Sequence, residues 1–412
     1  MEKDENPPLF DLAIIGGGIA GAGIARDSAL RGIKTVLFEK NTFGSGTSSK
    51  SSKLIHGGIR YLEIAWKEAL RGDFGSAWKN FIFVFQSLRE SRILARIAPG
   101  IVKPIALLVP LYKGSGQNIF TTALGALFYA FLGLITGKGK LPQIFWNAKD
   151  VLKMEPDLKA EGLEGAVVVW DHTTDDRQLV QQTINSAIKN GAAAYENAAV
   201  ISYAWHAEKN TFSIQLQREG RPETFWARKL VNAAGPWIDK VRKSGGAREE
   251  DYIYPVAGSH IEIPDFTQNS LILQAQDNRI FFVIRRGEKA RVGTTERFEP
   301  DPDRAEPAPE EIDYLLGQLR FYFPGRSFDK KNILSADAGI RPLVRPAHAK
   351  NAHDISREHE IRIDSAGVIH VPGVKLTDHR RAAEETVDLI AKDLIRVVPN
   401  IRLQSLTASL PL

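Results

Sequence analysis

The chain has 412 residues, with 54 Lys and Arg against 49 Asp and Glu and a formal net charge of +5. Hydrophobic residues make up 43% and charged residues 25%, a balance typical of globular proteins that excludes disordered and collagen-like classes. Because there is no cysteine, disulfides, thiolate nucleophiles, Cys-ligated zinc and iron–sulfur clusters are all excluded. If this protein transfers electrons, a bound organic cofactor must therefore carry them.

The positive charge is spread along the chain, with no run of five or more like charges, which argues against nucleic-acid binding. A modest surplus of cations suits small anionic molecules and an anionic membrane surface equally well. The first eight residues are acidic and lack the apolar core of a secretory signal, and the absence of cysteine fits a reducing compartment.

The N-terminal segment predicts a strand–helix–strand unit. Residues 9–15 are apolar and end at three glycines, as in a short buried strand, and a helix then runs to Ala29. Gly32 ends that helix, and residues 34–39 form a second strand. Such a unit starts a parallel sheet, so the sequence predicts an α/β fold.

Gly16, Gly18 and Gly21 lie in the turn between that strand and helix, with Glu39 at the end of the second strand. Glycines at this spacing let backbone N–H groups approach a pyrophosphate at the helix N-terminus, and an acid about 20 residues later accepts hydrogen bonds from a ribose. The sequence therefore predicts dinucleotide binding, and a glycine-rich turn without a ligand is the alternative.

The rest of the chain alternates helical and extended patterns. We expect helices at 61–99, 177–189, 312–321 and 378–395, and strands at 193–203, 212–216 and 229–233, with several short strands between 253 and 295.

Residues 119–136 carry no charge, and Lys138 and Lys140 follow. This length is at the lower limit for a membrane-spanning helix, and a span would separate two flanks that both look like parts of one globular enzyme. We expect a monotopic segment that dips into one leaflet, with a buried core helix as the second reading and a span as the third.

Further segments have the small residues that lie beside a nucleotide. Residues 47–61 are rich in Ser and Thr hydroxyls, which donate to phosphate oxygens without crowding them, and residues 231–237 lead a strand into small residues. Residues 373–378 precede the final helix, whose positive end would face the N1/C2 region of a reduced flavin.

These blocks resemble FAD-dependent glycerol-3-phosphate dehydrogenases, members of the D-amino-acid-oxidase-like flavoproteins. The resemblance extends from Asp11 to about Ile395, and its most specific block is Ser51-Ser52-Lys53-Leu54-Ile55-His56-Gly57-Gly58 with Arg60-Tyr61-Leu62. Other matching blocks are residues 16–23, 48–63, 88–99, 230–237, 258–261, 293–295, 339–343 and 375–377.

The resemblance implies a Rossmann-like FAD-binding domain of the D-amino-acid-oxidase/glutathione-reductase type, with an α+β substrate domain built on a β-sheet. We assign residues 8–65, 158–243 and 331–395 to a discontinuous FAD-binding domain and 244–330 to the substrate domain. Residues 66–157 are assigned to a helical segment that includes the apolar stretch, and residues 396–412 to a C-terminal tail.

The resemblance also implies a reaction, in which sn-glycerol 3-phosphate is oxidised to dihydroxyacetone phosphate by hydride transfer to flavin N5 and electrons pass to membrane quinone. It implies a cytoplasmic enzyme that is peripherally associated with the inner membrane through a lipid contact at 119–136, and it leaves a homodimer open. No metal site is expected, because no grouping of His, Asp and Glu has ligand spacing.

A phosphomonoester needs fixed cations, and the planar fork of Arg suits its oxygens. By motif position, the resemblance assigns Arg60, Arg341 and Lys375 to the substrate and its phosphate, with Tyr61 as a neighbouring hydroxyl.

Oxidation of a secondary alcohol also needs a base, and His suits that task. His260 and His56 lie in blocks that the resemblance places near the flavin. We prefer His260 as the base and His56 as an orienting group, with the reverse order and a structural role as alternatives. Five further histidines lie in polar segments that we expect to be exposed, and we assign them no role: His172, His206, His348, His353 and His359.

For FAD itself, the resemblance points to residues of the glycine turn, the hydroxyl-rich segment and the later blocks. They are Gly16, Gly18, Gly21, Glu39, Lys40, Thr47, Ser48, Ser49, Ser52, Lys53, Leu54, Ala234, Gly235, Trp237, Gly339, Lys375, Leu376 and Thr377.

The sequence departs from the family pattern in several places. Val374 replaces a usual glycine, Glu296 stands where relatives commonly have Asp, and Asp378 adds a carboxylate near the expected flavin pyrimidine. An ionised Asp378 close to the flavin would lower its potential, whereas the alternative is that this residue caps the last helix. The chain also ends about where relatives begin a C-terminal helical domain.

Two other functions stay open at this point. One is a related flavin oxidase for another small anionic hydroxy or amino substrate, with O₂ as the acceptor. The other is a flavin-binding redox module without turnover.

Overall fold

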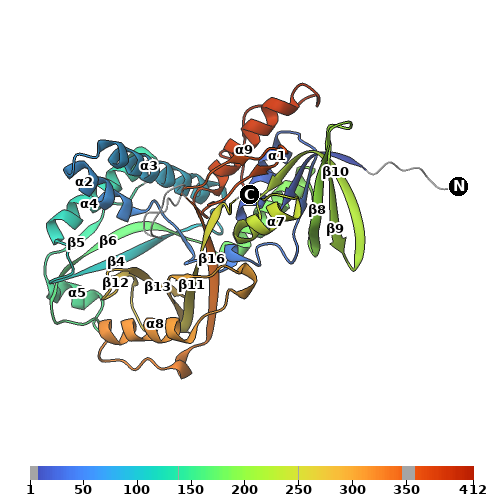
Figure 1. The fold of residues 1–412 in the computed structure, drawn as a ribbon. Helices are drawn as coiled ribbons and strands as arrows, with labels where there is room; N and C mark the ends of the chain where they lie inside the picture. Colours follow the sequence, from blue (N-terminus) through green and yellow to red (C-terminus); the bar gives the residue numbers. More distant parts are fainter. Residues whose placement is uncertain (1–7, 138, 249, 346–357) are drawn as a thin grey trace.

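Two β-sheets, each covered by helices, make up the fold (Figure 1). The structure is a computed structural model that describes residues 8–137, 139–248, 250–345 and 358–412, with the main chain but not the side chain of Arg60. In those ranges the first sheet has eight strands and the second has ten.

The first sheet contains the predicted strand–helix–strand unit. Its order is β17-β18-β10-β1-β2-β7, in which the strands from β18 to β7 run parallel. β9 pairs antiparallel with β10, and β8 pairs antiparallel with β9. The strands are β1 (Leu9–Ile15), β2 (Thr35–Phe38), β7 (Ala193–Tyr195), β8 (Ala198–His206), β9 (Thr211–Arg218), β10 (Arg221–Asn232), β17 (Arg362–Ile363) and β18 (Ile369–His370).

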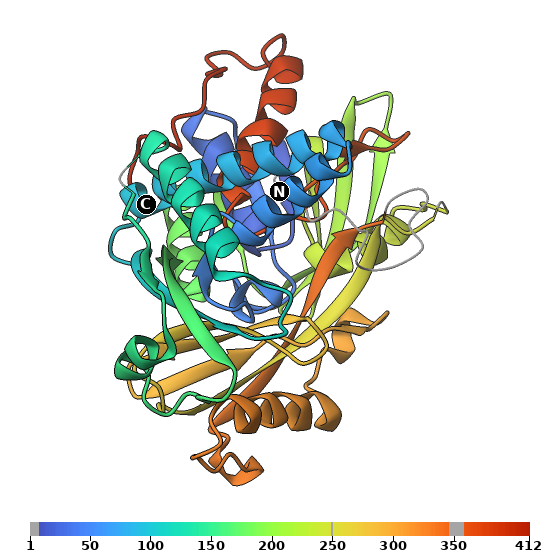
Figure 2. The ribbon, with the colours of Figure 1, turned by 90° about the vertical axis from the view of Figure 1, so that its left-hand side faces the viewer.

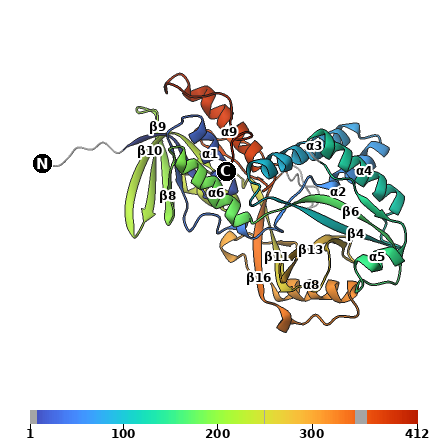
Figure 3. The same ribbon diagram turned by 180° about the vertical axis from the view of Figure 1, so that it is seen from behind.

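Three helices cover one face of this sheet: α1 (Ile19–Leu30), α6 (Asp176–Lys189) and α9 (His379–Leu394). α1 packs against both of the others, and Figure 3 shows it beside α6. Every residue of α1 is buried, so its charged groups need internal partners. Asp27 and Arg31, for example, form an ion pair at 2.7 Å.

The second sheet has the order β15-β11-β14-β13-β12-β4-β6-β3, with β16 beside β11 and β5 beside β6. Its strands are β3 (Leu54–Ile55), β4 (Lys103–Tyr112), β5 (Gln143–Phe145), β6 (Leu163–Thr173), β11 (Ile253–Pro264), β12 (Ser270–Gln274), β13 (Ile280–Arg286), β14 (Lys289–Gly293), β15 (Arg297–Phe298) and β16 (Ser335–Val344).

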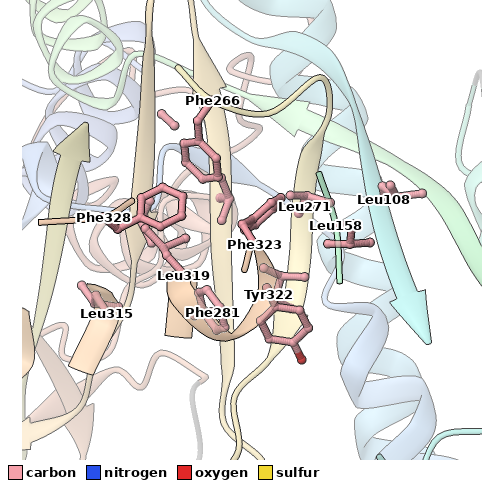
Figure 4. Close-up of a cluster of buried hydrophobic side chains, with 14 of the residues drawn as sticks. Leu108, Leu158, Phe266, Leu271, Phe281, Leu315, Leu319, Tyr322, Phe323 and Phe328 are labelled. Carbon is pink, nitrogen blue, oxygen red and sulfur yellow. The ribbon is translucent and has the colours of Figure 1, made fainter. Parts of the chain in front are cut away.

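Helices lie on both sides of the second sheet. α2 (Ile59–Leu70), α3 (Phe74–Ile97) and α4 (Ile119–Ile135) form a group on one side (Figure 2). α5 (Ala148–Met154) and α8 (Pro309–Tyr322) lie on the other, where Leu315 and Leu319 of α8 pack with Phe281 and Phe323 in a buried apolar cluster (Figure 4). The short α7 (Ile238–Ser244) follows β10.

Five of the described strands of the second sheet come from segments that the sequence analysis assigned elsewhere. β4 and β5 lie in the segment assigned as helical, and β3, β6 and β16 lie in ranges assigned to the FAD-binding domain. Pro104 and Pro110 lack the N–H donors that a central strand uses, so β4 did not read as a strand, yet it pairs with β6 from Lys103 to Tyr112. The division into domains stays a prediction, and these strands show where its boundaries differ from the sheets.

The apolar stretch at 119–136 forms α4, which packs on β6 and contacts α2 and α3. Across the described ranges, no helix combines the length and the apolar character that crossing a bilayer requires.

The turn between β1 and α1 leaves no room for a side chain at Gly21, because a Cβ there would lie 1.9 Å from the main-chain oxygen of Gly16. Gly21→Ala should therefore open the turn that is expected to bind the dinucleotide. If the overpacking cost of about 1–3 kcal/mol falls on the bound state, FAD binding becomes about 5- to 150-fold weaker. The measurement is FAD titration of the apoprotein, followed by flavin fluorescence.

Gly125→Ala is the matched control, because no atom lies within 4 Å of the added Cβ and alanine favours the surrounding helix α4. Unchanged FAD affinity in Gly21→Ala would show that the turn does not bind the cofactor.

Candidate active site

A cavity of about 560 Å³ lies where the two sheets meet. Its walls come from the β1–α1 turn, the segment after β2 and the start of α9 on one side, and from β11 and β16 on the other. The volume is in the range of cofactor and small-molecule sites.

At the glycine turn, the cavity has the groups that a dinucleotide needs. α1 begins without a side-chain cap and without an acidic residue in its first turn, so its positive end can face an anion. Ser48 Oγ accepts a hydrogen bond from the Ile19 N–H at 3.0 Å. The Glu39 carboxylate accepts from the N–H groups of Gly17 at 2.7 Å and Asn41 at 2.9 Å, which fixes it at the cavity wall.

A charged cluster lies beside Glu39. Lys40 Nζ is 2.8 Å from Asp303 and 4.0 Å from the centre of the Trp237 ring, and Trp237 Nε1 donates to Asp303 at 2.7 Å. Burial acts to raise the pKa of Asp303, but hydrogen bonds from Lys240, Lys40 and Trp237 outweigh it and hold that pKa well below its usual range. Asp303 therefore stays ionised and links the second sheet's connecting loop to the cofactor side of the cavity.

The hydroxyl-rich segment is bonded directly to the second sheet. Thr47 Oγ1 donates to the main-chain oxygen of Ile340 on β16 at 2.7 Å, and Ser52 Oγ lies 3.0 Å from Nε2 of His260 on β11. These contacts place the segment between the glycine turn and the residues of the second sheet.

Two predicted cofactor residues in the same segment have other partners. Lys53 Nζ pairs with the buried Asp176 and donates to the main-chain oxygen of Ser49 at 2.7 Å. Ser49 Oγ donates to the main-chain oxygen of Gly46 at 3.1 Å. Neither side chain is part of the cavity wall, so both hold the segment in shape.

His260 is almost completely buried at the cavity wall. Its Nδ1 has no hydrogen-bond partner among the described residues, and Asp337 Oδ1, which is 4.0 Å away, pairs instead with Arg291 at 2.7 Å. Burial and the nearby cations Arg291 and Arg341 hold the pKa of His260 well below its usual value. The imidazole is therefore neutral at pH 7 and can accept a proton.

Arg341 reaches the cavity from β16. Its Nη1 pairs with Glu296 at 2.8 Å and its Nη2 donates to the main-chain oxygen of Thr295 at 2.8 Å. The guanidinium is thus oriented by Glu296, which stands where relatives commonly have Asp.

Lys375 lines the cavity with its ammonium group over aromatic rings. Its Nζ is 4.1 Å from the centre of the Phe83 ring and 5.2 Å from that of Tyr61, as in cation–π contacts. Tyr61 packs edge-on against Phe83 at 4.8 Å and is not itself part of the cavity wall. The main chain of Arg60 lies in the first turn of α2, and its side chain is outside the described part of the chain.

The start of α9 contributes Thr377 and Asp378 to the cavity wall. Thr377 Oγ1 accepts from the N–H of His56 at 3.2 Å, which keeps these two predicted residues together. The alternative that Asp378 caps α9 is wrong, because its side chain makes no capping bond. The buried carboxylate instead accepts from Ser87 Oγ at 3.2 Å.

Most of the predicted residues come together in this one cavity. The cofactor residues that line it are Gly16, Gly18, Glu39, Lys40, Thr47, Ser48, Ser52, Leu54, Ala234, Gly235, Trp237, Gly339, Lys375, Leu376 and Thr377, together with His56, His260 and Arg341. Gly21, Ser49, Lys53 and Tyr61 lie behind it. The individual roles of these residues stay predictions.

Other residues of the wall were missed. Phe83 and Ser87 are four residues apart on one face of α3, a spacing that could have indicated a shared face. Lys50 and Lys240 also line the cavity, and Asp303 reaches it from a proline-rich connection. Lys50 lies within the hydroxyl-rich segment expected beside a nucleotide, whereas nothing in the local sequence signals Lys240 or Asp303.

The expectation that His172 and His359 are exposed is wrong, and His348 and His353 lie outside the described residues. His172 is buried with its Nδ1 2.9 Å from Ser91 Oγ, and burial lowers its pKa to about 4. The His359 side chain is 4% exposed and pairs with Glu385 at 2.8 Å. Polar neighbours in the sequence do not report which residues are neighbours in space.

The geometry fits FAD. An uncapped helix start, a ribose-facing carboxylate and a hydroxyl-rich segment line one continuous cavity, as a dinucleotide requires. Trp237 and Lys40 close the part next to Glu39. The remaining wall carries the imidazole of His260 and the cations Arg341 and Lys375.

Residues 11–388 match the family of FAD dependent oxidoreductases (DAO). Aerobic glycerol-3-phosphate dehydrogenases from Staphylococcus saprophyticus and Staphylococcus aureus are 34% identical to this chain over 402 residues, which are 96% of this chain and 69% of each relative.

Solved structures agree with this match. The glycerol-3-phosphate dehydrogenase from Bacillus halodurans, complexed with FAD, is 28% identical with a TM-score of 0.75 and covers 98% of this chain and 67% of its own. Glycine oxidase from Geobacillus kaustophilus, at 19% identity and a TM-score of 0.67, shares the fold over 93% of this chain and 95% of its own. These likenesses confirm the expected fold class, the family resemblance and FAD as the cofactor. The chain belongs to the family of FAD-dependent oxidoreductases that includes the aerobic glycerol-3-phosphate dehydrogenases.

Proposed function

We propose that this oxidoreductase converts sn-glycerol 3-phosphate to dihydroxyacetone phosphate. The observation that carries the proposal is that the buried His260 and Arg341 line the same cavity, which fits FAD. The named activity of relatives at 34% identity supports the choice of substrate. FAD, when bound, would supply the acceptor for a hydride from C2 of the substrate, so the protein must hold the phosphate and accept the hydroxyl proton.

Arg341 and Lys375 are the proposed phosphate ligands. The planar guanidinium of Arg341 suits two phosphate oxygens, and its partner Glu296 keeps it aimed into the cavity. Lys375 adds a compact charge, which the rings of Phe83 and Tyr61 hold in place. Arg60 is the third proposed ligand.

His260 is the proposed base, and His56 the proposed orienting group. The hydrogen bond between Ser52 Oγ and His260 Nε2 fixes the imidazole ring at the wall. Arg291 and Arg341 depress the pKa of His260, and a bound phosphate dianion would offset their charge. Substrate binding therefore makes the imidazole more basic when the proton has to be accepted.

An exposed apolar surface on the helices grouped in Figure 2 supports membrane association and quinone reduction. We define it by Trp66, Leu70, Phe74, Trp78, Phe120, Leu124, Phe128, Phe131, Leu134 and Ile135, whose exposed fractions run from 43% to 72%. Exposed cations, such as Lys67 and Lys140, lie among these helices and beside them. Large apolar side chains with nearby cations are typical of a helix that lies in a lipid interface. We propose that this surface contacts the cytoplasmic leaflet of the inner membrane, where quinone takes the electrons.

Anaerobic mixing with glycerol 3-phosphate tests the proposed reaction. The visible flavin band of the holoenzyme should bleach promptly, and a quinone analogue should restore it faster than air does. Arg341→Ala should keep FAD but need about 30- to 4,000-fold more substrate for the same bleaching, because loss of a partner from a buried charge pair costs about 2–5 kcal/mol.

Arg326→Ala is the matched control, since Arg326 pairs with Asp157 at the surface. Bleaching only by a different anionic substrate, or rapid restoration by air, would favour the oxidase reading. Loss of FAD from Arg341→Ala would contradict its assignment to the substrate.

Replacing the proposed base should slow flavin reduction without releasing FAD. His260→Asn is expected to reduce the rate by about 10²–10⁴-fold in stopped-flow measurements, and His56→Asn by less. Because the pKa of His260 lies below its usual value, the neutral base persists as pH falls through 6.5 and is lost only at lower pH. The acid limb of kcat/KM should therefore lie below pH 6.5. A larger effect of His56→Asn than of His260→Asn would make His56 the base and His260 the orienting group.

The membrane contact is tested with the double variant Phe128→Ser, Phe131→Ser. Burying one Phe contributes about 1.5–3 kcal/mol, so vesicle binding should weaken about tenfold or more in co-sedimentation with phosphatidylglycerol vesicles. Trp205→Ser is the control, because that side chain is exposed on β8 of the first sheet. Equal sedimentation of the double variant and the unmodified protein would refute this surface.

A further inference from the structure

Residues 56–58 form a short piece of the cavity wall between β3 and α2. His56 and Gly58 line the cavity, whereas the N–H of Gly57 between them donates to groups behind the wall. These acceptors are Tyr129 Oη at 2.9 Å and Asp171 Oδ1 at 3.3 Å. The position of this segment therefore depends on residues that do not touch the cavity.

Tyr129 and Asp171 form a buried pair contributed by two different elements. The hydroxyl of Tyr129 on α4 donates to Asp171 Oδ1 at 2.8 Å, and Asp171 lies on β6. Their exposed fractions are 3% and 6%. Burying a carboxylate costs free energy, which its hydrogen bonds to the hydroxyl and to the Gly57 N–H and the charge on Arg92 offset.

The segment is fixed from a second side by α9. The N–H of His56 donates to Thr377 Oγ1, and Thr377 lines the cavity. Consecutive N–H groups of one segment are thus bonded to the cofactor side and to the buried pair. A shift of the pair has to move the segment relative to Thr377.

The packing around Gly57 leaves no room for a side chain. A Cβ at this position would lie 2.6 Å from Tyr129 Oη and 2.6 Å from Leu88 Cγ. The main chain is therefore in close contact with both side chains, and a small movement of Tyr129 reaches residues 56–58 directly.

Asp171 changes charge near neutral pH. Burial raises its pKa to about 7, against the lowering effect of the hydrogen bonds from Tyr129 and Gly57 and of the charge on Arg92 of α3. The charged and titratable groups that face it are Tyr129 from α4 and Arg92 from α3. Its neighbour His172 stays neutral over this range, because burial lowers its pKa to about 4. As pH falls through about 7, Asp171 takes up a proton and has fewer lone pairs for the Gly57 N–H.

We propose that Asp171 and Tyr129 are positioning residues, which set residues 56–58 against the bound flavin through the Gly57 N–H. Protonation of Asp171 loosens that bond and changes the surroundings of the flavin. The proposal rests on FAD as the cofactor and holds whichever substrate the enzyme oxidises.

The experiment is a pH titration of flavin fluorescence and absorption in the substrate-free holoenzyme. The unmodified protein should show a step centred near pH 7. Asp171→Asn should lose the step, because the group that titrates is gone. Tyr129→Phe should move the step to higher pH, because the hydroxyl that favours the ionised carboxylate has been removed.

Hydrogen exchange supplies the second readout. Exchange of a peptide that covers residues 56–58 should be about tenfold faster in Tyr129→Phe, since one hydrogen bond that protects Gly57 is lost. Tyr112→Phe is the matched control, because it removes a half-buried hydroxyl that donates to the main-chain oxygen of Lys159 elsewhere in the second sheet. It should change neither readout.

A step that persists unchanged in Asp171→Asn, or the absence of any step in the unmodified holoenzyme, would overturn the proposal. So would a step and an exchange rate in Tyr129→Phe equal to those of the control. None of these measurements uses a substrate, so they fail or succeed independently of the anaerobic bleaching by glycerol 3-phosphate.

Discussion

The bonds between the hydroxyl-rich segment and the second sheet are the constraint on which the cavity depends. Thr47 is bonded to β16, Ser52 to His260 on β11, and the main-chain oxygen of Ser51 accepts from Arg291 at 2.9 Å. The segment that wraps the cofactor site is thus bonded to the strands that carry the proposed base and the phosphate ligand. Short hydrogen bonds set the distance between this segment and the strands of the second sheet. A shift of one sheet relative to the other would therefore break these bonds and distort the site.

The charges in the cavity are balanced in a way that leaves the base neutral. Arg291 and Arg341 each have a carboxylate partner, Asp337 and Glu296, yet their charge still depresses the pKa of His260. Protonating the imidazole would add a third cation to a buried cluster, which is unfavourable until an anion arrives. The arrangement therefore couples occupation of the proposed phosphate site to the basicity of the imidazole.

Local sequence patterns predicted the structure correctly where interacting residues are close in sequence. They failed where the interacting residues are distant in sequence. The β1–α1–β2 unit and its glycines could be predicted from spacing alone. The blocks that match the family contain most of the residues that line the cavity. Lys53 turns away because its partner Asp176 comes from α6, and Asp378 does not cap its helix because Ser87 of α3 donates to it. Such side-chain directions are set by tertiary contacts that no local pattern contains.

α4 shows why its apolar sequence supported two readings. Small residues such as Ala123 and Ala126 let one face pack closely on β6, as in a core helix, while large side chains such as Phe120 and Phe131 remain exposed on the other. The inward face also carries Tyr129, whose hydroxyl must find a buried partner and finds Asp171. Because that partner also accepts from Gly57, rotation of α4 about its axis would break a bond in the cavity wall. A helix with an exposed apolar surface and a polar inner contact is therefore fixed in rotation by the hydrogen bond at its buried face, and not by the apolar packing alone.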